Sequence, residues 1–472
     1  MPASPSTARA INDRLALRLL QHEGPLTAGQ LKQLTGLSRP TVADLVERLT
    51  ASGLIEMVGE SGEQRRGPNA RLYGIVGNRA YLAALDVRTE GVSVLVSDLV
   101  GRVLAEASVP IDGESGTGPA VEQAVALVER AAKEAGAEHL HTVCVGAPGL
   151  IDPATGELRD TTGLPAWHRR LVAALHERLP DTRIVAENET NLAALAEQRD
   201  GAAHDRDTFV LLWLGMGIGA AVVLDGMLRR GASGGAGEIG FLPVPGTRGF
   251  PSATDCEGGF HSLAGAGAVL ELARECGVLG ADGAGEGTGA AGVVRWAVAE
   301  VGGIGVGGDA GVDAGGGLDV GGSDVGVGLG GESDVGDSDV GVGLGGGPDA
   351  GDSDGGVDAG SDPDASVDAR RPDPTRDTGP RNAAATRFLD ALADRLALGV
   401  ASVVALLDPG CVVLGGEVGQ AGGDELAVRV AERIVRMSPL PAEVRPSVLG
   451  GAAVLRGALL TAQDGAQGEL FG

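Results

Sequence analysis

The run GMGIGAAVVLDGMLRRGASGGAGEIGFLPV, residues 215–244, decides the fold of this chain. Together with the six apolar residues before it, this run alternates strands of aliphatic and β-branched residues with glycine turns. The expected strands are Phe209–Leu214, Ala220–Asp225 and Met227–Arg230. Strands joined by such short turns pair with their neighbours, so the stretch predicts a meander.

The same order of elements occurs once more, nearer the N-terminus. There the expected elements are the strands Leu82–Val87, Val92–Asp98 and Arg102–Pro110, a helix over Val121–Ala135 and a strand over Thr142–Gly146. Toward the C-terminus we expect a helix over Ala384–Leu406 and a strand over Val412–Leu414, ending in Gly415 and Gly416. This repetition predicts an internal duplication of one α/β unit. Two similar lobes with a cleft between them would follow.

Residues 301–374 form an acidic insert dominated by Gly, Asp, Val and Ser. The sequence SDVGVGLGG occurs twice, at residues 323–331 and 338–346, which gives a 15-residue period. Calcium-binding Gly/Asp repeats have a nine-residue period instead. Between Gly302 and Ala369 there are 15 acidic residues and no Lys or Arg. With almost no large side chains to bury, this segment is expected to be disordered.

The length and the cysteines indicate more than one domain in a reducing compartment. The 472 residues exceed the roughly 250–300 residues at which single cores stop growing. The four cysteines show no CxxC spacing, which fits a cytoplasmic protein without a disulfide framework. No apolar run approaches the roughly 20 residues that span a bilayer. We therefore expect a soluble, cytoplasmic protein without a membrane partner.

The charge is distributed unevenly. Residues 1–75 contain nine Lys or Arg and seven Asp or Glu, which gives them a net charge of +2. Because the whole chain has a net charge of −27, the remaining residues together carry −29. We therefore expect only this N-terminal head to approach nucleic acid.

The head has the signals of a helix-turn-helix. Apolar spacing predicts a helix over Ile11–Leu20, and Thr27 with Gln30 forms a capping box that opens a second helix ending at Gly36. Ser38 is a good N-cap for a third helix, which Gly53 closes. Its buried stripe is Val42, Leu45, Val46 and Leu49. Its exposed side would keep Arg39, Thr41, Asp44 and Arg48.

A basic hairpin follows the third helix. Its expected strands are Leu54–Val58 and Leu72–Ile75, and its tip, Gln64–Arg71, concentrates arginines and turn formers. Such a wing can neutralise phosphates or enter the minor groove. The predicted DNA contacts are Ser38, Arg39, Thr41, Arg48, Arg65 and Arg66. The alternative is a merely packed three-helix unit with a solvated turn.

Three further runs carry a family resemblance. Gly215–Val244, Ala186–Glu197 (AENETNLAALAE) and Asp408–Gly419 (DPGCVVLGGEVG) resemble the ROK family of repressors and sugar kinases. With the winged head, the chain is similar to the transcriptional-regulator branch. The resemblance implies a two-lobed, actin-like fold and a homodimer or homotetramer. The expected domains are 1–76 (winged head), 80–300 and 375–472 (two parts of the ROK domain), and 301–374 (insert).

The sequence departs from the family kinases at two motifs. Their phosphate turn, Asp-x-Gly-Gly-Thr, is here Asp86-Val-Arg-Thr-Glu90, which lacks both glycines. Their catalytic Asp of an Asn-Asp pair is replaced in Asn188-Glu189, and the longer side chain displaces the base. We therefore expect no catalytic residue.

The resemblance also implies ligand contacts. Asn188, Glu189 and Glu238 would bind sugar hydroxyls, and His261 could add a hydrogen bond. The alternatives are that Asn188 caps a helix and Glu238 is solvated. The family's zinc site keeps only Cys256, since Phe241 replaces its histidine, so we expect neither metal nor cofactor. Phe241 and Phe260 would hold that loop by packing instead.

The sequence therefore predicts an α/β protein with a winged helix-turn-helix, a two-lobed sugar-kinase-like domain and a disordered insert. The expected function is a ligand-responsive transcriptional regulator, a repressor that binds operator DNA and senses a sugar. One alternative is an ATP-dependent sugar kinase with a DNA-binding head. Another is a constitutive DNA-binding regulator whose pocket has decayed, which Phe241 and Ser262 favour.

Overall fold

The computed structural model describes residues 5–61, 70–111, 116–159, 164–247, 249–254, 257–279, 288–303 and 379–471. Three predicted features lie outside these ranges. They are the wing tip with Arg65 and Arg66, the position of Cys256, and the insert from residue 304 onward.

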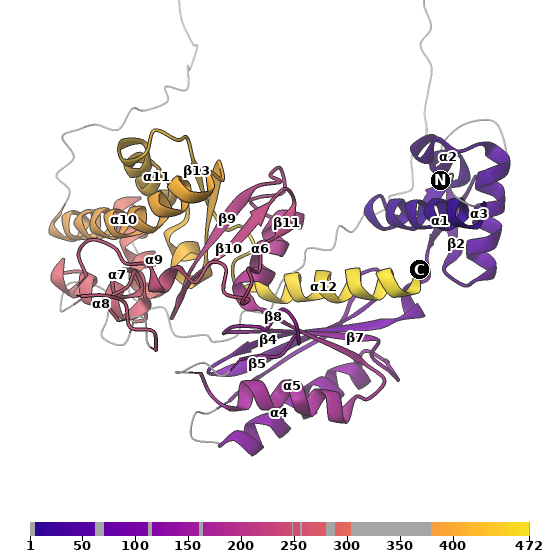
Figure 1. Ribbon diagram of the computed structural model, residues 1–472, viewed down its shortest axis with the longest axis horizontal. Helices are drawn as coiled ribbons and strands as arrows, with labels where there is room; N and C mark the ends of the chain where they lie inside the picture. Colours follow the sequence, from indigo (N-terminus) through magenta and orange to yellow (C-terminus); the bar gives the residue numbers. More distant parts are fainter. Residues whose placement is uncertain are drawn as a thin grey trace, which may run out of the picture. The chain divides into compact units, whose positions relative to one another are not determined.

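The head is a winged helix-turn-helix, as predicted (Figure 1). It consists of α1 (Pro5–His22), β1 (Leu26–Thr27), α2 (Ala28–Thr35), α3 (Arg39–Ala51), β2 (Ile55–Ser61) and β3 (Ala70–Ile75). The capping box is present: the Thr27 hydroxyl accepts from the Gln30 N–H at 3.2 Å, and the Gln30 side chain accepts from the Thr27 N–H at 2.9 Å. Gly36 ends α2 at φ +69°, a left-handed conformation that favours glycine. The predicted stripe of α3 is buried.

Two five-stranded sheets with the same topology follow, which confirms the predicted duplication. The first has the order β6-β5-β4-β7-β8 and the second β11-β10-β9-β12-β13. In each, three antiparallel strands adjoin two parallel ones. The first sheet comprises β4 (Tyr81–Arg88), β5 (Gly91–Asp98), β6 (Val103–Pro110), β7 (Thr142–Ala147) and β8 (Arg183–Asn188). The second comprises β9 (Phe209–Leu214), β10 (Ile218–Leu224), β11 (Met227–Leu228), β12 (Cys411–Gly415) and β13 (Glu443–Pro446).

Helices cover both faces of each sheet (Figure 1). Beyond the first sheet lie α4 (Thr117–Glu134) and α5 (Trp167–Arg178). Beyond the second lie α7 (His261–Ala264), α8 (Ala266–Glu275), α9 (Ala290–Val301), α10 (Pro380–Leu407) and α11 (Gly416–Met437). Between the sheets lie α6 (Glu189–Asp200) and α12 (Ala453–Leu470), whose buried side chains share a core with both. This central helix pair joins the two lobes.

The structure differs from the predicted elements at their ends. Strand β11 stops at Leu228, because the chain then enters a loop in which Arg230 pairs with Glu187. The helices α6, α11 and α12 had no predicted bounds. Among the described residues, no helix combines the length and apolarity that a bilayer span requires.

The contact between α6 and α12 leaves no room for a side chain at Gly457. A Cβ there would lie 1.9 Å from the Leu192 carbonyl oxygen. We expect Gly457→Ala to force the two helices apart and to lower the free energy of unfolding by at least about 1–3 kcal/mol, the usual cost of overpacking. Thermal melting of the purified protein measures this.

Gly465→Ala on the same helix is the matched control. A Cβ at 465 would meet only the Arg183 guanidinium, at an ordinary 3.9 Å. Because alanine favours a helix over glycine by about 1 kcal/mol, this variant should melt at the wild-type temperature or above. Equal melting temperatures for the two variants would contradict the close helix contact.

Candidate functional site

A cavity of about 210 Å³ opens between the two lobes. The first lobe contributes Asp86, Arg88 and Glu90 at the end of β4, and the second contributes Trp213 and Glu417. The first residues of the central helices complete it, Glu189 on α6 and Val454 on α12. The cleft predicted from the duplication is therefore present, and its walls are rich in carboxylates.

Arg88 connects the two walls of this cleft. Its Nε donates to Asp86 Oδ2 at 3.0 Å, and its Nη1 donates to Glu417 Oε1 at 2.7 Å, across the lobes. Burial raises the pKa of the Asp86 carboxyl, and the neighbouring Arg88 offsets part of that rise. Asp86 Oδ1 is buried and has no hydrogen-bond partner within the described ranges.

Glu189 is a strongly perturbed acid of the cleft. Burial raises the pKa of its carboxyl to about 8, and the negative charges of Asp86 and Glu238 add to the rise. Its Oε2 is buried and lacks a hydrogen-bond partner among the residues that the structure describes. The site therefore holds a carboxyl that is protonated near neutral pH, next to a second carboxylate with a free oxygen.

The side-chain amide of Asn188 makes its hydrogen bonds within the protein. Its Oδ1 accepts from the N–H groups of Thr190 and Asn191 at 2.9 and 3.3 Å, and its Nδ2 donates to the Gly149 carbonyl at 3.0 Å. Both ends of the amide are engaged, so the geometry favours the capping alternative over a ligand contact. By fixing the first turn of α6, Asn188 positions Glu189.

Glu238 lies close enough to Glu189 to affect its titration. The preceding Gly237 has φ +92°, and a Cβ there would lie 1.8 Å from the Ala220 carbonyl oxygen, so only glycine fits this approach. Glu238 stays open to solvent, although partial desolvation raises the pKa of its carboxyl. Neither Glu238 nor His261 lines the cleft itself, and burial lowers the pKa of the His261 imidazole.

The packing that we expected from Phe241 and Phe260 is present in part. Phe260 is fully buried and packs against Gly399 of α10, while Phe241 is half-buried. Within the described ranges, no three His, Cys, Asp or Glu side chains cluster in a way that could hold a metal ion.

On the head, α3 presents part of the predicted DNA face. Ser38 caps the helix, and its hydroxyl lies 2.8 Å from that of Thr41. Arg39 is exposed in the first turn. Arg48 makes contacts that the sequence did not predict: its Nη2 lies 2.5 Å from Asp13 Oδ1 of α1, and it also pairs with Asp44. Arg48 thus joins α3 to α1, and its DNA contact stays a prediction.

Asp86, Arg88 and Glu417 were missed as ligand-site candidates. The signal was present in the turn Asp86-Val-Arg-Thr-Glu90, where an arginine stands between two acids. Its partner Glu417 is 329 residues away, and sequence spacing does not reveal such a contact.

Comparison with known proteins is consistent with this architecture. Residues 11–67 match the MarR family, and residues 82–264 and 376–465 match the ROK family. The chain is 28% identical over 244 residues to the DNA-binding transcriptional dual regulator NagC of Escherichia coli (strain K12), covering 50% of this chain and 58% of that protein. It is 23% identical over 238 residues to the xylose repressor of Caldicellulosiruptor bescii, covering 50% and 59%. The chain thus spans less than two thirds of these curated relatives.

Solved structures share the fold. A ROK family transcriptional regulator, a homologue of the E. coli MLC protein, superimposes with a TM-score of 0.65 at 16% identity, covering 98% of both chains. A ROK family glucokinase from Streptomyces griseus, solved with glucose and AMPPNP, gives 0.53 at 19% identity, covering 82% of this chain and 100% of that one. At these identities the likeness concerns the fold alone. The sequence match to the ROK family covers more than half of the chain, which therefore belongs to the ROK family.

Proposed function

We propose that this chain is a DNA-binding transcriptional regulator, a repressor that responds to a neutral sugar. One combination of features carries the proposal: a winged head with an exposed first turn of α3, in the same chain as a cleft with two unpartnered, buried carboxyl oxygens. The names of relatives support it, since they include an N-acetylglucosamine repressor and a xylose repressor. Operator DNA as partner implies that the protein works in the cytoplasm.

The proposed DNA contacts begin at the N-terminus of α3. Ser38, Arg39 and Thr41 occupy the cap and first turn, the part of a recognition helix that meets base edges and phosphates. Arg65 and Arg66 of the wing would add phosphate contacts.

The cleft favours a neutral ligand over a phosphorylated one. Its ionisable side chains are four acids, Asp86, Glu90, Glu189 and Glu417, of which Glu189 is protonated near neutral pH, and one base, Arg88. A phosphate would be repelled by these carboxylates, whereas hydroxyls can donate to them. Asp86 would accept from a sugar hydroxyl, protonated Glu189 would donate to one, and Glu238 would close the ligand from the rim. The volume of about 210 Å³ suits a monosaccharide.

The proposed function does not include transfer of a phosphoryl group. The turn at the end of β4 carries Arg88 and Thr89 in place of the two glycines, and Glu90 adds a negative charge, so backbone N–H groups cannot close around a phosphate as in the family kinases. Arg88 is already committed to Asp86 and Glu417.

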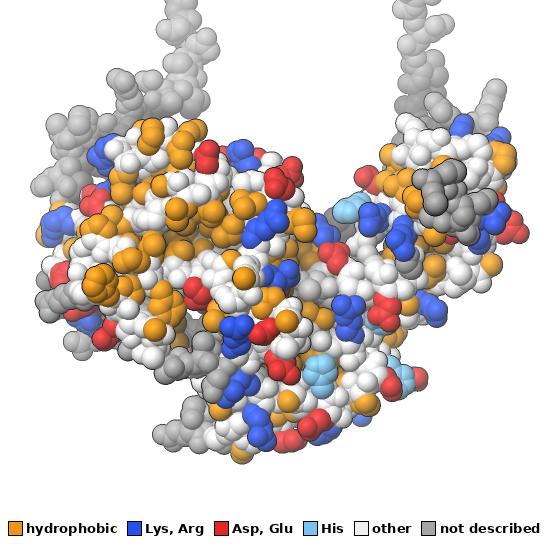
Figure 2. All heavy atoms as spheres, viewed as in Figure 1, with side chains coloured by type: hydrophobic (Ala, Val, Ile, Leu, Met, Phe, Trp, Pro, Cys, Tyr) orange, Lys and Arg blue, Asp and Glu red, His pale blue; other side chains and the backbone are white. Residues whose placement is uncertain are grey.

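Pairing of two chains would present two heads to two half-sites. Hydrophobic side chains gather over the lobe that carries α8 to α11 (Figure 2). Large exposed ones there are Leu406 of α10 and Val428, Val435 and Met437 of α11. Val428 and Val435 are seven residues apart and share a face of α11. This face is our proposed homodimer contact.

To test this function, the wild-type protein is first used to select the DNA duplexes that it prefers from a random-sequence pool. Affinity for the selected duplex is then measured with and without N-acetylglucosamine, xylose and other neutral sugars. A regulator requires that one of these sugars change the affinity, because a ligand acts only through its different affinity for two conformations. If none does, the constitutive alternative holds.

We expect two arginines of α3 to behave differently. Arg39→Ala should weaken binding to the selected duplex roughly tenfold while the melting temperature stays unchanged, because an exposed base or phosphate contact is lost. Arg48→Ala should instead lower the melting temperature, because Asp13 loses its partner. Band-shift titration and thermal melting separate the two effects. A reversed pattern would refute the assignment of both residues.

Glu189 should make stability depend on pH. Its pKa is about 8 in the native cleft against an ordinary 4.5. Between these values the unfolded chain releases the proton that the native chain keeps, so the free energy of unfolding falls as pH rises from about 4.5 to about 8. Glu189→Gln removes this penalty, so its gain in melting temperature over wild type should grow from pH 5 to pH 8. Glu106→Gln, at an exposed position on β6, is the control and should follow wild type at both pH values. A constant gain would mean that Glu189 is ionised like an exposed acid.

Purified protein should not phosphorylate hexoses with ATP and magnesium. The reason is that the turn Asp86-Val-Arg-Thr-Glu90 lacks both glycines of the kinase phosphate turn. A coupled assay with a known sugar kinase in parallel measures this. Turnover near the roughly 1–100 per second of ordinary kinases would establish the sugar-kinase alternative.

A further inference from the structure

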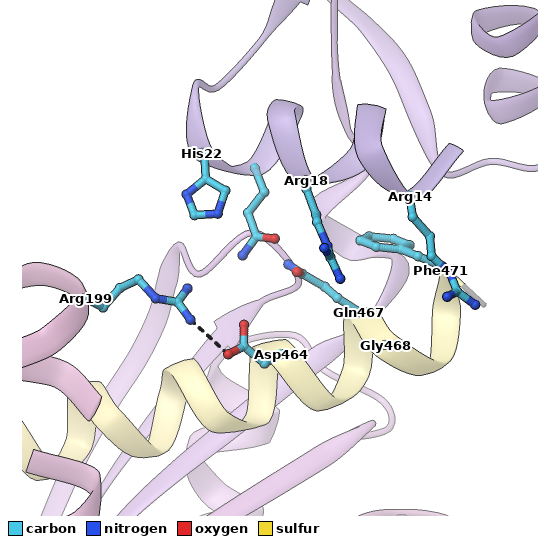
Figure 3. A pocket seen from close by; sticks show the side chains of 9 residues that line it. Arg14, Arg18, His22, Arg199, Asp464, Gln467, Gly468 and Phe471 are labelled. Atoms are coloured by element: carbon cyan, nitrogen blue, oxygen red, sulfur yellow. Dashed lines mark hydrogen bonds and ion pairs between the residues drawn. The ribbon is translucent and has the colours of Figure 1, made fainter. Parts of the chain in front are cut away.

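A second cavity lies where the head meets the central helices. Its volume is about 450 Å³, and its walls come from α1, α6 and α12 (Figure 3). Arg14, Arg18 and His22 extend from α1 toward α12, and Phe471 closes one end. This pocket is separate from the sugar cleft, with which it shares no residue.

The ionisable side chains of this pocket are mostly basic. Arg14, Arg18 and His22 follow one another at intervals of four residues, which places them on one face of α1. Arg199 of α6 adds a third guanidinium. Asp464 is the one carboxylate among the lining residues, and Arg199 Nη2 holds it at 3.0 Å. In a chain of net charge −27, this is a local concentration of positive charge.

Two of these arginines are unpaired. Neither Arg14 nor Arg18 makes a hydrogen bond or ion pair with any residue that the structure describes. Their neighbour Asp13 could have neutralised them, but it is committed to Arg48. Both are exposed to solvent, and two guanidinium groups that line one cavity without a counter-ion are suited to binding an anion.

We propose that this pocket binds a small phosphate-bearing molecule. Guanidinium groups donate paired N–H bonds that match the geometry of phosphate oxygens. The side chains of Gln21 and Gln467, which also line the pocket, provide neutral polar groups for the rest of such a ligand. The volume is within the range of small-molecule sites, roughly 300–1,000 Å³. The cleft and this pocket would therefore take ligands of different charge.

The bound phosphate would link the head to the ligand domain. Arg14 and Arg18 belong to the head, whereas Arg199 ends α6, a helix that begins at Glu189 in the cleft. Contacts from both parts to one anion would stabilise their association. This inference does not depend on sugar sensing or DNA binding, and its test uses neither.

The test is calorimetric titration of the full-length protein with inorganic phosphate and with glucose 6-phosphate, in sodium chloride of matched ionic strength. We expect saturable binding of both anions. Arg14→Gln and Arg18→Gln should each weaken it roughly tenfold or more, because a charge-assisted contact is lost. Arg18→Lys should fall between, because it keeps the charge and loses the paired geometry.

Arg9→Gln is the matched control, since Arg9 is exposed on the same helix and does not line the pocket. It removes one positive charge and should leave phosphate affinity at the wild-type value. Two outcomes would overturn the proposal: binding no stronger than that of chloride, or equal loss in Arg9→Gln and Arg18→Gln. The second would mean that phosphate responds only to net charge.

Discussion

The packing of α12 against α6 is the constraint on which the other features depend. At Gly457 the two helices approach so closely that no side chain fits. The pair fills the space between the two sheets, so the lobes share one core through it. Its first residues, Glu189 and Val454, lie in the cleft, and residues near its other end line the head pocket. At 1.5 Å per residue, the 18 residues of α12 extend over about 27 Å.

The cleft and the head pocket differ in their charged side chains. The cleft has four acids around one arginine, and the head pocket has three arginines around one acid. In each, the single opposite charge is already paired, Arg88 with Asp86 and Glu417, and Asp464 with Arg199. What remains for a ligand is carboxyl oxygens in one site and guanidinium groups in the other. Charge, more than volume, therefore decides which ligand each cavity accepts.

The sequence predicted what local signals encode. The capping box of Thr27, the stripe of α3 and the duplicated meander all depend on residues within a few positions, and the structure confirms them. Long-range pairings were not predictable. The ion pair of Arg48 with Asp13 joins residues 35 positions apart, and that of Arg88 with Glu417 joins residues 329 positions apart. Local sequence patterns do not reveal either pairing. Helix α12 lacked a signal for its place between the sheets, since burial on nearly every side removes the amphipathic pattern.

The unpartnered carboxyl oxygens of Asp86 and Glu189 have an energetic consequence. A buried polar atom without a hydrogen bond costs about 1–3 kcal/mol, so these two oxygens lower the stability of the fold. A ligand whose hydroxyls bind both oxygens would recover that free energy, because Asp86 of β4 and Glu189 at the start of α6 line the same cleft. The Arg88–Glu417 ion pair joins the two lobes beside these oxygens. In the proposed regulator, a ligand bound here would act on the contact between the two lobes, and the central helices extend from this point to the head.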